Sequence, residues 1–140
     1  MAKILPKGKG VWVPIDHGVT DFPCVGLENI EATITAIIAG GANVIVAHKG
    51  VVDKYSHLCE GTATSMIAHL SASTRHGGKN HSNKVLVGDV DEAIMRGAVG
   101  VSVQANIGSK KESTMLQRMG HITTEAVSYT HLRAHETAQY

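Results

Sequence analysis

The stretch that decides the fold of this protein is Val11-Trp12-Val13-Pro14-Ile15-Asp16-His17-Gly18-Val19-Thr20. A short apolar run, rich in β-branched residues, ends abruptly in an acid, an imidazole and a glycine. Such a run, bounded by breakers, is typical of a buried strand. In parallel sheets covered by helices, ligands bind at the carboxyl ends of the strands. Asp16 and His17 are therefore candidates for chemistry, although Asp-His-Gly could also form a capped turn.

Working outward, the chain alternates between short apolar runs and amphipathic segments. Isoleucines in 28–39 recur at helical spacing, and Asp89 and Glu92 have the spacing of a capping box at the start of another helix. Residues 51–61 are predicted to be a polar connection that contains a helical turn, and 75–83 an exposed loop. We predict strands at 11–15, 44–47, 65–71 and 99–103, a short extended piece at 84–87, and helices at 28–39, 90–96 and 109–126.

This alternation predicts an α/β fold in which helices cover a parallel sheet. Successive strands lie roughly 30 residues apart, as in an eight-fold (β/α) barrel, of which four such units would form half. Doubly wound sheets have similar units, so the spacing leaves both architectures open. Pro14 disfavours a central strand position, because it has no N–H for the ladder.

Composition narrows the class of protein. The chain has 140 residues, of which 43% are hydrophobic, enough for one core, and its formal charge of +1 favours neither a nucleic-acid nor a membrane partner. No apolar run approaches the about 20 residues that span a bilayer, and the first residues lack the apolar region of a signal peptide. Cys24 and Cys59 have no metal-binding or redox spacing. We expect reduced thiols in a cytoplasmic protein.

Residues 127–140 differ from the rest of the chain. They contain two of the three tyrosines and show no helical or strand periodicity. They also resemble the translation of a sequencing adapter, so we predict a domain at 1–126 and a non-native tail at 127–140. The alternative is an ordinary polar C-terminal helix. His131 and His135 are accordingly left out of any predicted metal site.

The predicted strand ends allow three chemical interpretations. His17, His48 and His69 could form a facial metal site, although none has a partner at helical spacing. Lys49 could be a Schiff-base nucleophile, which requires desolvation, or an exposed ammonium group that binds a phosphate. Asp16 could be a general base for a proton on carbon or on a hydroxyl group. We prefer the third interpretation.

Several motifs make the sequence recognisable when they are taken together. They are Val13-Pro14-Ile15-Asp16-His17-Gly18-Val19-Thr20, Gly40-Gly41-Ala42-Asn43-Val44, His48-Lys49-Gly50, His69-Leu70-Ser71, Val101-Ser102-Val103 and Asn106-Ile107-Gly108-Ser109. With these motifs the chain resembles the archaeal-type class I aldolase family, from about residue 9 to residue 126. The resemblance covers the first half of the family's barrel and also accounts for Pro14.

The resemblance implies a partial (β/α)8 TIM barrel, about its first four βα units, from an enzyme that uses a lysine Schiff base and needs no metal or other cofactor. The family's Schiff-base lysine lies on the sixth strand and its proton-donating tyrosine follows the fifth, and neither strand is present here. Lys49 is not that lysine, so the chain alone is expected to be inactive. The implied reaction is aldol cleavage of a sugar phosphate, or transfer of its three-carbon ketone unit to an amino-acid aldehyde.

By this resemblance Asp16 is the residue of proton transfer, and the loop after it contacts a sugar-phosphate substrate. The residues expected to bind substrate are His17, Gly18, Val19, Thr20, His48 and Lys49. Gln104 and Ala105 depart from the family's His and Val, as Val99-Gly100 does from its Ala-Asp pair, which puts the fourth strand's contribution in doubt. The full-length protein is expected to be a homo-oligomer. Two alternatives are a metal-dependent lyase and a half-barrel that binds phosphosugars without chemistry or dimerises to close its open edges.

Overall fold

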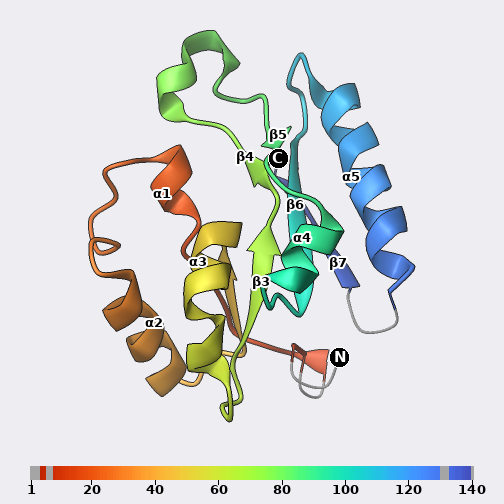
Figure 1. The fold of residues 1–140 in the computed structure, drawn as a ribbon. Coiled ribbons are helices and arrows are strands. Elements are labelled where there is room, and N and C mark those ends of the chain that lie inside the picture. Colours follow the sequence, from red (N-terminus) through yellow and green to blue (C-terminus); the bar gives the residue numbers. More distant parts are fainter. Residues whose placement is uncertain (1–3, 6–7, 130–132, 140) are drawn as a thin grey trace.

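The computed structural model of the protein describes residues 4–5, 8–129 and 133–139 (Figure 1). The strands are β1 (Trp12–Pro14), β2 (Val44–Ala47), β3 (Ser65–His69), β4 (Ser71–Ala72), β5 (Val85–Leu86), β6 (Gly100–Asn106) and β7 (Arg133–Gln139). The α-helices are α1 (His17–Thr20), α2 (Ile30–Ala39), α3 (Lys49–Tyr55), α4 (Val90–Met95) and α5 (Glu112–Val127), and the 3-10 turns are η2 (Ser56–Cys59) and η3 (Arg75–Asn80).

Five strands form one parallel sheet in the order β1-β2-β3-β6-β7, which confirms the predicted parallel arrangement. Its register places Val13 opposite Ile45 and Ile45 opposite Met66. The short strands β4 and β5 pair antiparallel beyond the end of β3. Because all five main strands run the same way, their carboxyl ends share one edge of the sheet.

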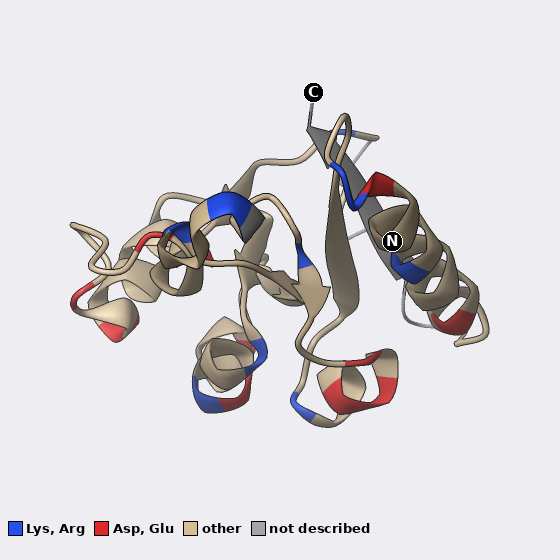
Figure 2. Ribbon diagram, turned by 90° about the horizontal axis from the view of Figure 1, so that it is seen from above, with Lys and Arg blue, Asp and Glu red and all other residues tan. Residues whose placement is uncertain are grey.

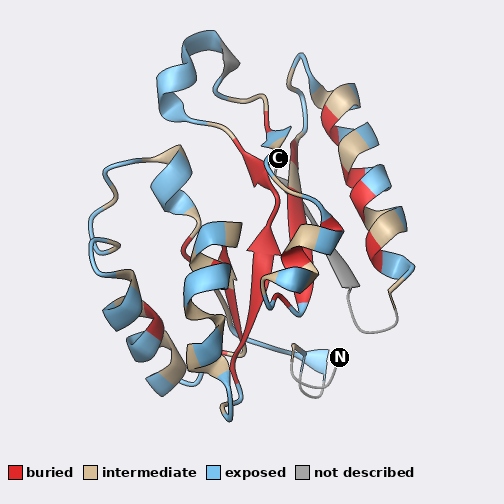
Figure 3. Cartoon of the chain, viewed as in Figure 1, coloured by how far each residue is buried: buried red, intermediate tan, exposed pale blue. Residues whose placement is uncertain are grey.

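The helices α2, α3, α4 and α5 form an arc outside the curved sheet (Figure 2). A doubly wound sheet has helices on both faces, whereas a barrel has them only outside, so this arc favours the barrel. The core lies between the two layers, and Figure 3 shows its buried residues on the strands and on the inner faces of the helices. Fully buried side chains there include Ile34, Ile45, Met115 and Ile122.

Local sequence signals fix the helix ends. The Asp89 carboxylate accepts a hydrogen bond of 2.8 Å from the Glu92 N–H, so half of the predicted capping box is formed. Asn29 caps α2 in the same way, through the Ala32 N–H. After α2, Gly41 has a φ of 77°, which favours glycine and ends the helix.

The structure differs from the sequence prediction in three segments. The polar connection at 51–61, predicted with a helical turn, is helical over more of its length, with most of α3 followed by η2, and the predicted loop at 75–83 contains η3. In the predicted tail, α5 continues to Val127 and β7 pairs in parallel with β6. Pairing uses only backbone groups, so it requires no side-chain alternation. His131 lies outside the described residues, and the origin of 127–140 stays a prediction. Within the described ranges, no helix has the length and apolarity needed to cross a bilayer.

Candidate active site

A cavity of about 460 Å³ opens at the carboxyl edge of the sheet. The residues that line it are Trp12, Pro14, Asp16, His17, Thr20, Asp21, Val46, His69, Lys84, Ser102 and Gln104. Three residues predicted from the sequence are therefore brought together here, namely Asp16, His17 and Thr20. The other four predicted site residues, Gly18, Val19, His48 and Lys49, do not line this cavity.

Asp16 follows β1 directly and is held at the strand end by the hydrogen bond of 2.8 Å from the Ile15 N–H to the Val46 carbonyl. It occupies the N-cap position of α1, but its side chain makes no capping hydrogen bond. The capped-turn alternative therefore does not account for this carboxylate. Asp16 Oδ2 instead lies 3.6 Å from His69 Nε2, and 21% of the Asp16 side chain is exposed. The carboxylate is both accessible and oriented by a neighbour.

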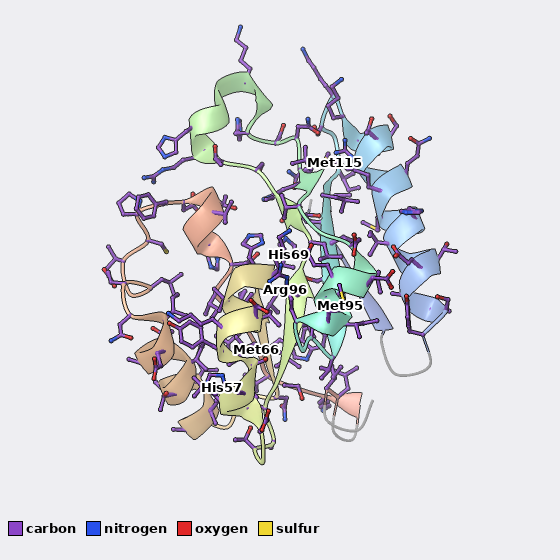
Figure 4. All side chains as sticks on the ribbon, in the orientation of Figure 1. His57, Met66, His69, Met95, Arg96 and Met115 are labelled. Atoms are coloured by element: carbon purple, nitrogen blue, oxygen red, sulfur yellow. The ribbon has the colours of Figure 1, made fainter. Side chains whose placement is uncertain are left out.

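His69 is the last residue of β3 and lies at the centre of the molecule (Figure 4). Its ring is almost fully buried, and Nδ1 lies 2.7 Å from Ser102 Oγ. Burial lowers the pKa of His69 to about 4, although the negative charge of Asp16 opposes this shift. The ring is therefore neutral near pH 7. If the Ser102 hydroxyl donates to Nδ1, the ring proton is on Nε2 and faces Asp16.

His48 supports His69 from the neighbouring strand end. Its Nδ1 donates to the His69 carbonyl at 3.0 Å, and the two ring centroids are 5.6 Å apart. Burial lowers the pKa of His48 below its ordinary value. Its Nε2 is buried and has no hydrogen-bond partner among the described residues. His48 therefore stiffens this corner of the site from behind, a position different from the substrate contact expected of it.

Lys49 lies in the helix layer instead of in the cavity. As the first residue of α3, it extends its ammonium group to Glu92 of α4, 2.9 Å away. Arg96, which Figure 4 shows between α3 and α4, contacts both Glu92 and Asp53. We call Lys49, Asp53, Glu92 and Arg96 the helix-layer cluster. Hydrogen bonds from Lys49 and then Arg96 hold the pKa of Glu92 below its ordinary value. This position does not favour substrate binding or Schiff-base formation by Lys49.

Sequence reasoning missed three polar residues of the cavity wall as site candidates: Asp21, Lys84 and Ser102. Ser102 faces inward from the middle of β6, where a polar residue within an apolar run was the available signal. Lys84 comes from the segment just before β5. Gln104, singled out as a departure from the family, does line the cavity.

Among the described residues, no group of three or more His, Cys, Asp or Glu side chains is placed to hold a metal ion, so His17, His48 and His69 form no such site. We call Asp16, His48, His69, Lys84 and Ser102 the strand-end cluster.

Residues 10–132 match the model of the DeoC/LacD family of aldolases. The chain belongs to this aldolase family. The match confirms the resemblance seen in the motifs and includes all of the lining residues of the cavity.

Curated members of the aldolase family support the same assignment. The chain is 34% identical over 123 residues to 2-amino-3,7-dideoxy-D-threo-hept-6-ulosonate synthase 1 of Archaeoglobus fulgidus, covering 88% of this chain and 46% of that protein. It is 34% identical over 114 residues to the corresponding synthase of Halobacterium salinarum, covering 81% of this chain and 42% of that protein. The chain thus spans about half the length of the curated relatives it matches.

Solved structures of aldolases share the fold. A Schiff-base-forming fructose-1,6-bisphosphate aldolase superposes with a TM-score of 0.78 at 24% identity, covering 95% of this chain and 54% of that chain. The crystal structure of an archaeal fructose 1,6-bisphosphate aldolase gives a TM-score of 0.75 at 25% identity with the same coverage. The predicted partial (β/α)8 TIM barrel is confirmed, and the doubly wound alternative is excluded.

Proposed function

We propose that this chain is the first half of a class I aldolase-type enzyme that makes or breaks a carbon–carbon bond of a sugar phosphate through a lysine Schiff base. The observation that carries the proposal is the Asp16 carboxylate, which lies at the cavity without a capping role and faces a neutral His69. The family assignment supports it, as does the fold shared with a Schiff-base-forming fructose-1,6-bisphosphate aldolase.

The relatives at 34% identity favour one reaction within this class, that of the 2-amino-3,7-dideoxy-D-threo-hept-6-ulosonate synthases. In that reaction the enzyme transfers a three-carbon ketone unit from a deoxy-ketohexose phosphate to L-aspartate semialdehyde, for 3-dehydroquinate and aromatic amino acid biosynthesis. Fructose-bisphosphate aldolase is the second candidate, favoured by the structural neighbours. In either case we propose a cytoplasmic homo-oligomer without a cofactor.

The residues of this chain have distinct roles in the proposed reaction. Asp16 accepts a proton from a substrate hydroxyl group as the carbon–carbon bond breaks, and returns it in the direction of synthesis. His17 and Thr20, on the turn after Asp16, contact the sugar phosphate at the rim of the cavity. By the family resemblance, the Schiff-base lysine comes from a later barrel strand. Lys49 does not take that role, since its ammonium group is paired with Glu92 and it does not line the cavity.

Borohydride trapping tests the proposal. The chain is treated with borohydride and either a deoxy-ketohexose phosphate or fructose 1,6-bisphosphate, alone and after co-expression with the remaining half of the Archaeoglobus fulgidus synthase. Adducts are located by mass spectrometry. We expect an adduct only in the complemented sample, on the partner half. A stable adduct on Lys49 of the chain alone would contradict the assignment of the nucleophile.

The same preparations separate the other functional classes. A folded dimer in sedimentation, with phosphosugar binding and no adduct in any sample, would favour the non-catalytic half-barrel. Turnover that disappears after exhaustive chelation would favour the metal-dependent lyase. Turnover that survives chelation would remove it.

A further inference from the structure

Lys84 is a largely buried residue whose ammonium group reaches the cavity. The residue is only 9% exposed and lines the cavity together with Asp16 and His69. Among the residues that the structure describes, its ammonium group has no hydrogen-bond or ion-pair partner. Lys49 differs, since a carboxylate 2.9 Å away pairs with its ammonium group at a more exposed position. A charge with little access to water is costly to keep unless a partner offsets it, so a largely buried lysine without a paired carboxylate is suited to bind a ligand.

The backbone of Lys84 is fixed on both sides by α5. Its N–H donates to Met115 Sδ at 3.3 Å, and the Arg118 guanidinium donates to its carbonyl at 2.8 Å. The next residues form β5, which pairs with β4 directly beyond the end of β3. So restrained a backbone fixes where the side chain begins, which reduces part of the entropy lost on binding.

The charges around Lys84 are mixed, because two carboxylates line the same cavity as its ammonium group. The carboxylates of Asp16 and Asp21 line the same cavity and attract the ammonium group without reaching ion-pair distance. Burial lowers the pKa of Lys84, and these two carboxylates oppose that shift. His69 is neutral near pH 7 and does not compete for an anion. Lys84 is the single lysine or arginine among the residues that line this cavity, so it offers a permanent positive charge to a ligand there.

We propose that Lys84 binds an oxyanion of the substrate, a phosphate or a carboxylate, inside the cavity beside Asp16. Lysine is a common phosphate ligand and acts as a point charge that tolerates either group. An anion held by Lys84 fixes one end of the ligand and leaves a neighbouring hydroxyl group within reach of the Asp16 carboxylate. The inference rests on the proposed function, because a sugar-phosphate enzyme acting on an amino-acid aldehyde has substrates with both kinds of anion.

Trp12 provides the readout for a binding test, since it is the single tryptophan and lines the cavity. Its fluorescence is followed in the 140-residue chain during titration with inorganic phosphate, dihydroxyacetone phosphate and L-aspartate, with uncharged dihydroxyacetone as the blank. The variants are Lys84→Met, Lys84→Arg and the matched control Lys54→Met, which removes a lysine of α3 that packs over Tyr55. We expect Lys84→Met to weaken anion binding by about tenfold or more, as for the loss of a charged hydrogen bond. Lys84→Arg should stay within about threefold of the parent, and Lys54→Met should not differ from it.

The two anion sources give different results. Weakening confined to the phosphates assigns Lys84 to the phosphate group, and weakening confined to L-aspartate assigns it to a carboxylate. Equal affinities of parent and Lys84→Met for every probe would overturn the proposal, as would a Trp12 signal that no anion changes. If Lys84→Met does not fold, the lysines of the parent chain are ¹³C-methylated and followed by NMR. The Lys84 resonance is assigned as the one that is absent from the spectrum of Lys84→Arg. We expect phosphate to shift this resonance. An unshifted resonance at saturating phosphate would equally reject it.

Failure of this inference is distinguishable from failure of the proposed function. The fluorescence titration measures occupancy of the cavity and requires no bond to be made or broken. Lys84-dependent anion binding without any trapped adduct would leave the inference standing and reject the aldolase chemistry. A trapped adduct, together with anion binding that is unchanged by substitution of Lys84, would support the aldolase chemistry and reject the inference.

Discussion

The helix-layer cluster and the strand-end cluster both contain lysines and carboxylates, yet the two regions treat charge in opposite ways. In the helix layer, Lys49, Arg96 and Glu92 are joined by contacts of about 2.9 Å near the surface. At the strand ends, the contact between Asp16 and His69 is 3.6 Å, the histidine is held neutral by burial, and Lys84 is unpaired among the described residues. In Figure 2 most of the charged residues lie on helices and loops, and few lie on the strands.

In this molecule the charged residues that pair with one another lie apart from the residues proposed to act on a substrate. Exposed, paired charges contribute little to stability, and because they are already paired they are not available to bind a ligand. Buried, incompletely paired groups are costly to keep, and such groups gather where a protein binds or transforms something. Four substitutions or conditions can break or sharpen this contrast.

The largest effect is expected for Asp16→Asn, with Asp53→Asn of the helix-layer cluster as the matched control. Removing a general base lowers turnover by about 10²- to 10⁴-fold, whereas the control should retain the activity of the parent. Steady-state kinetics of the chain complemented with the second half of a relative measure both. Similar losses in the two variants would erase the distinction between the clusters.

Acid should destabilise the fold through His69. Its pKa is about 4 in the folded state and 6.5 for the free side chain, so the unfolded state binds more protons below pH 6.5. The free energy of unfolding should therefore fall by about 3 kcal/mol from this group between pH 7.5 and pH 4. In urea denaturation across this pH range, the free energy of unfolding of His69→Gln should fall less with decreasing pH than that of the parent. The exposed His121→Gln serves as control, and identical slopes in all three proteins would refute the buried neutral ring.

A smaller effect is expected at the start of α4. Asp89→Ala removes the cap on the Glu92 N–H, and loss of such a cap costs about 1 kcal/mol of stability. Asp89→Asn retains an oxygen acceptor and should remain close to the parent. Thermal denaturation of the three proteins measures the difference in stability. An Asp89→Asn variant as unstable as Asp89→Ala would argue against capping.

The smallest effect is expected for Lys49→Met. The ion pair with Glu92 is partly exposed, so chemical denaturation should show little change, and none in high salt. In the fluorescence titration this variant should bind phosphate like the parent. Loss of phosphate affinity would restore the sequence-based prediction that Lys49 contacts the substrate.

The sequence could predict the strands and the residue that closes the first of them, because apolar runs and the breakers after them are local signals. It could not place Lys49, because one residue beyond a strand end decides between the cavity and the first turn of a helix. Lys84 was missed for a different reason. Its burial depends on β5 folding back to β4 and on contacts from α5, more than 30 residues further along the chain. The link between His69 and Ser102 likewise joins two strands that only the fold makes adjacent.

The brevity of β1 has a consequence for how copies of this chain meet. Within the described residues β1 is one edge of the main sheet, and it has only three residues, the last of them Pro14. A strand from another molecule would find few backbone donors there, because proline has no N–H and the turn of α1 begins soon after. We therefore expect this border of the sheet to resist the strand-to-strand growth that leads to fibrils, even at high concentration.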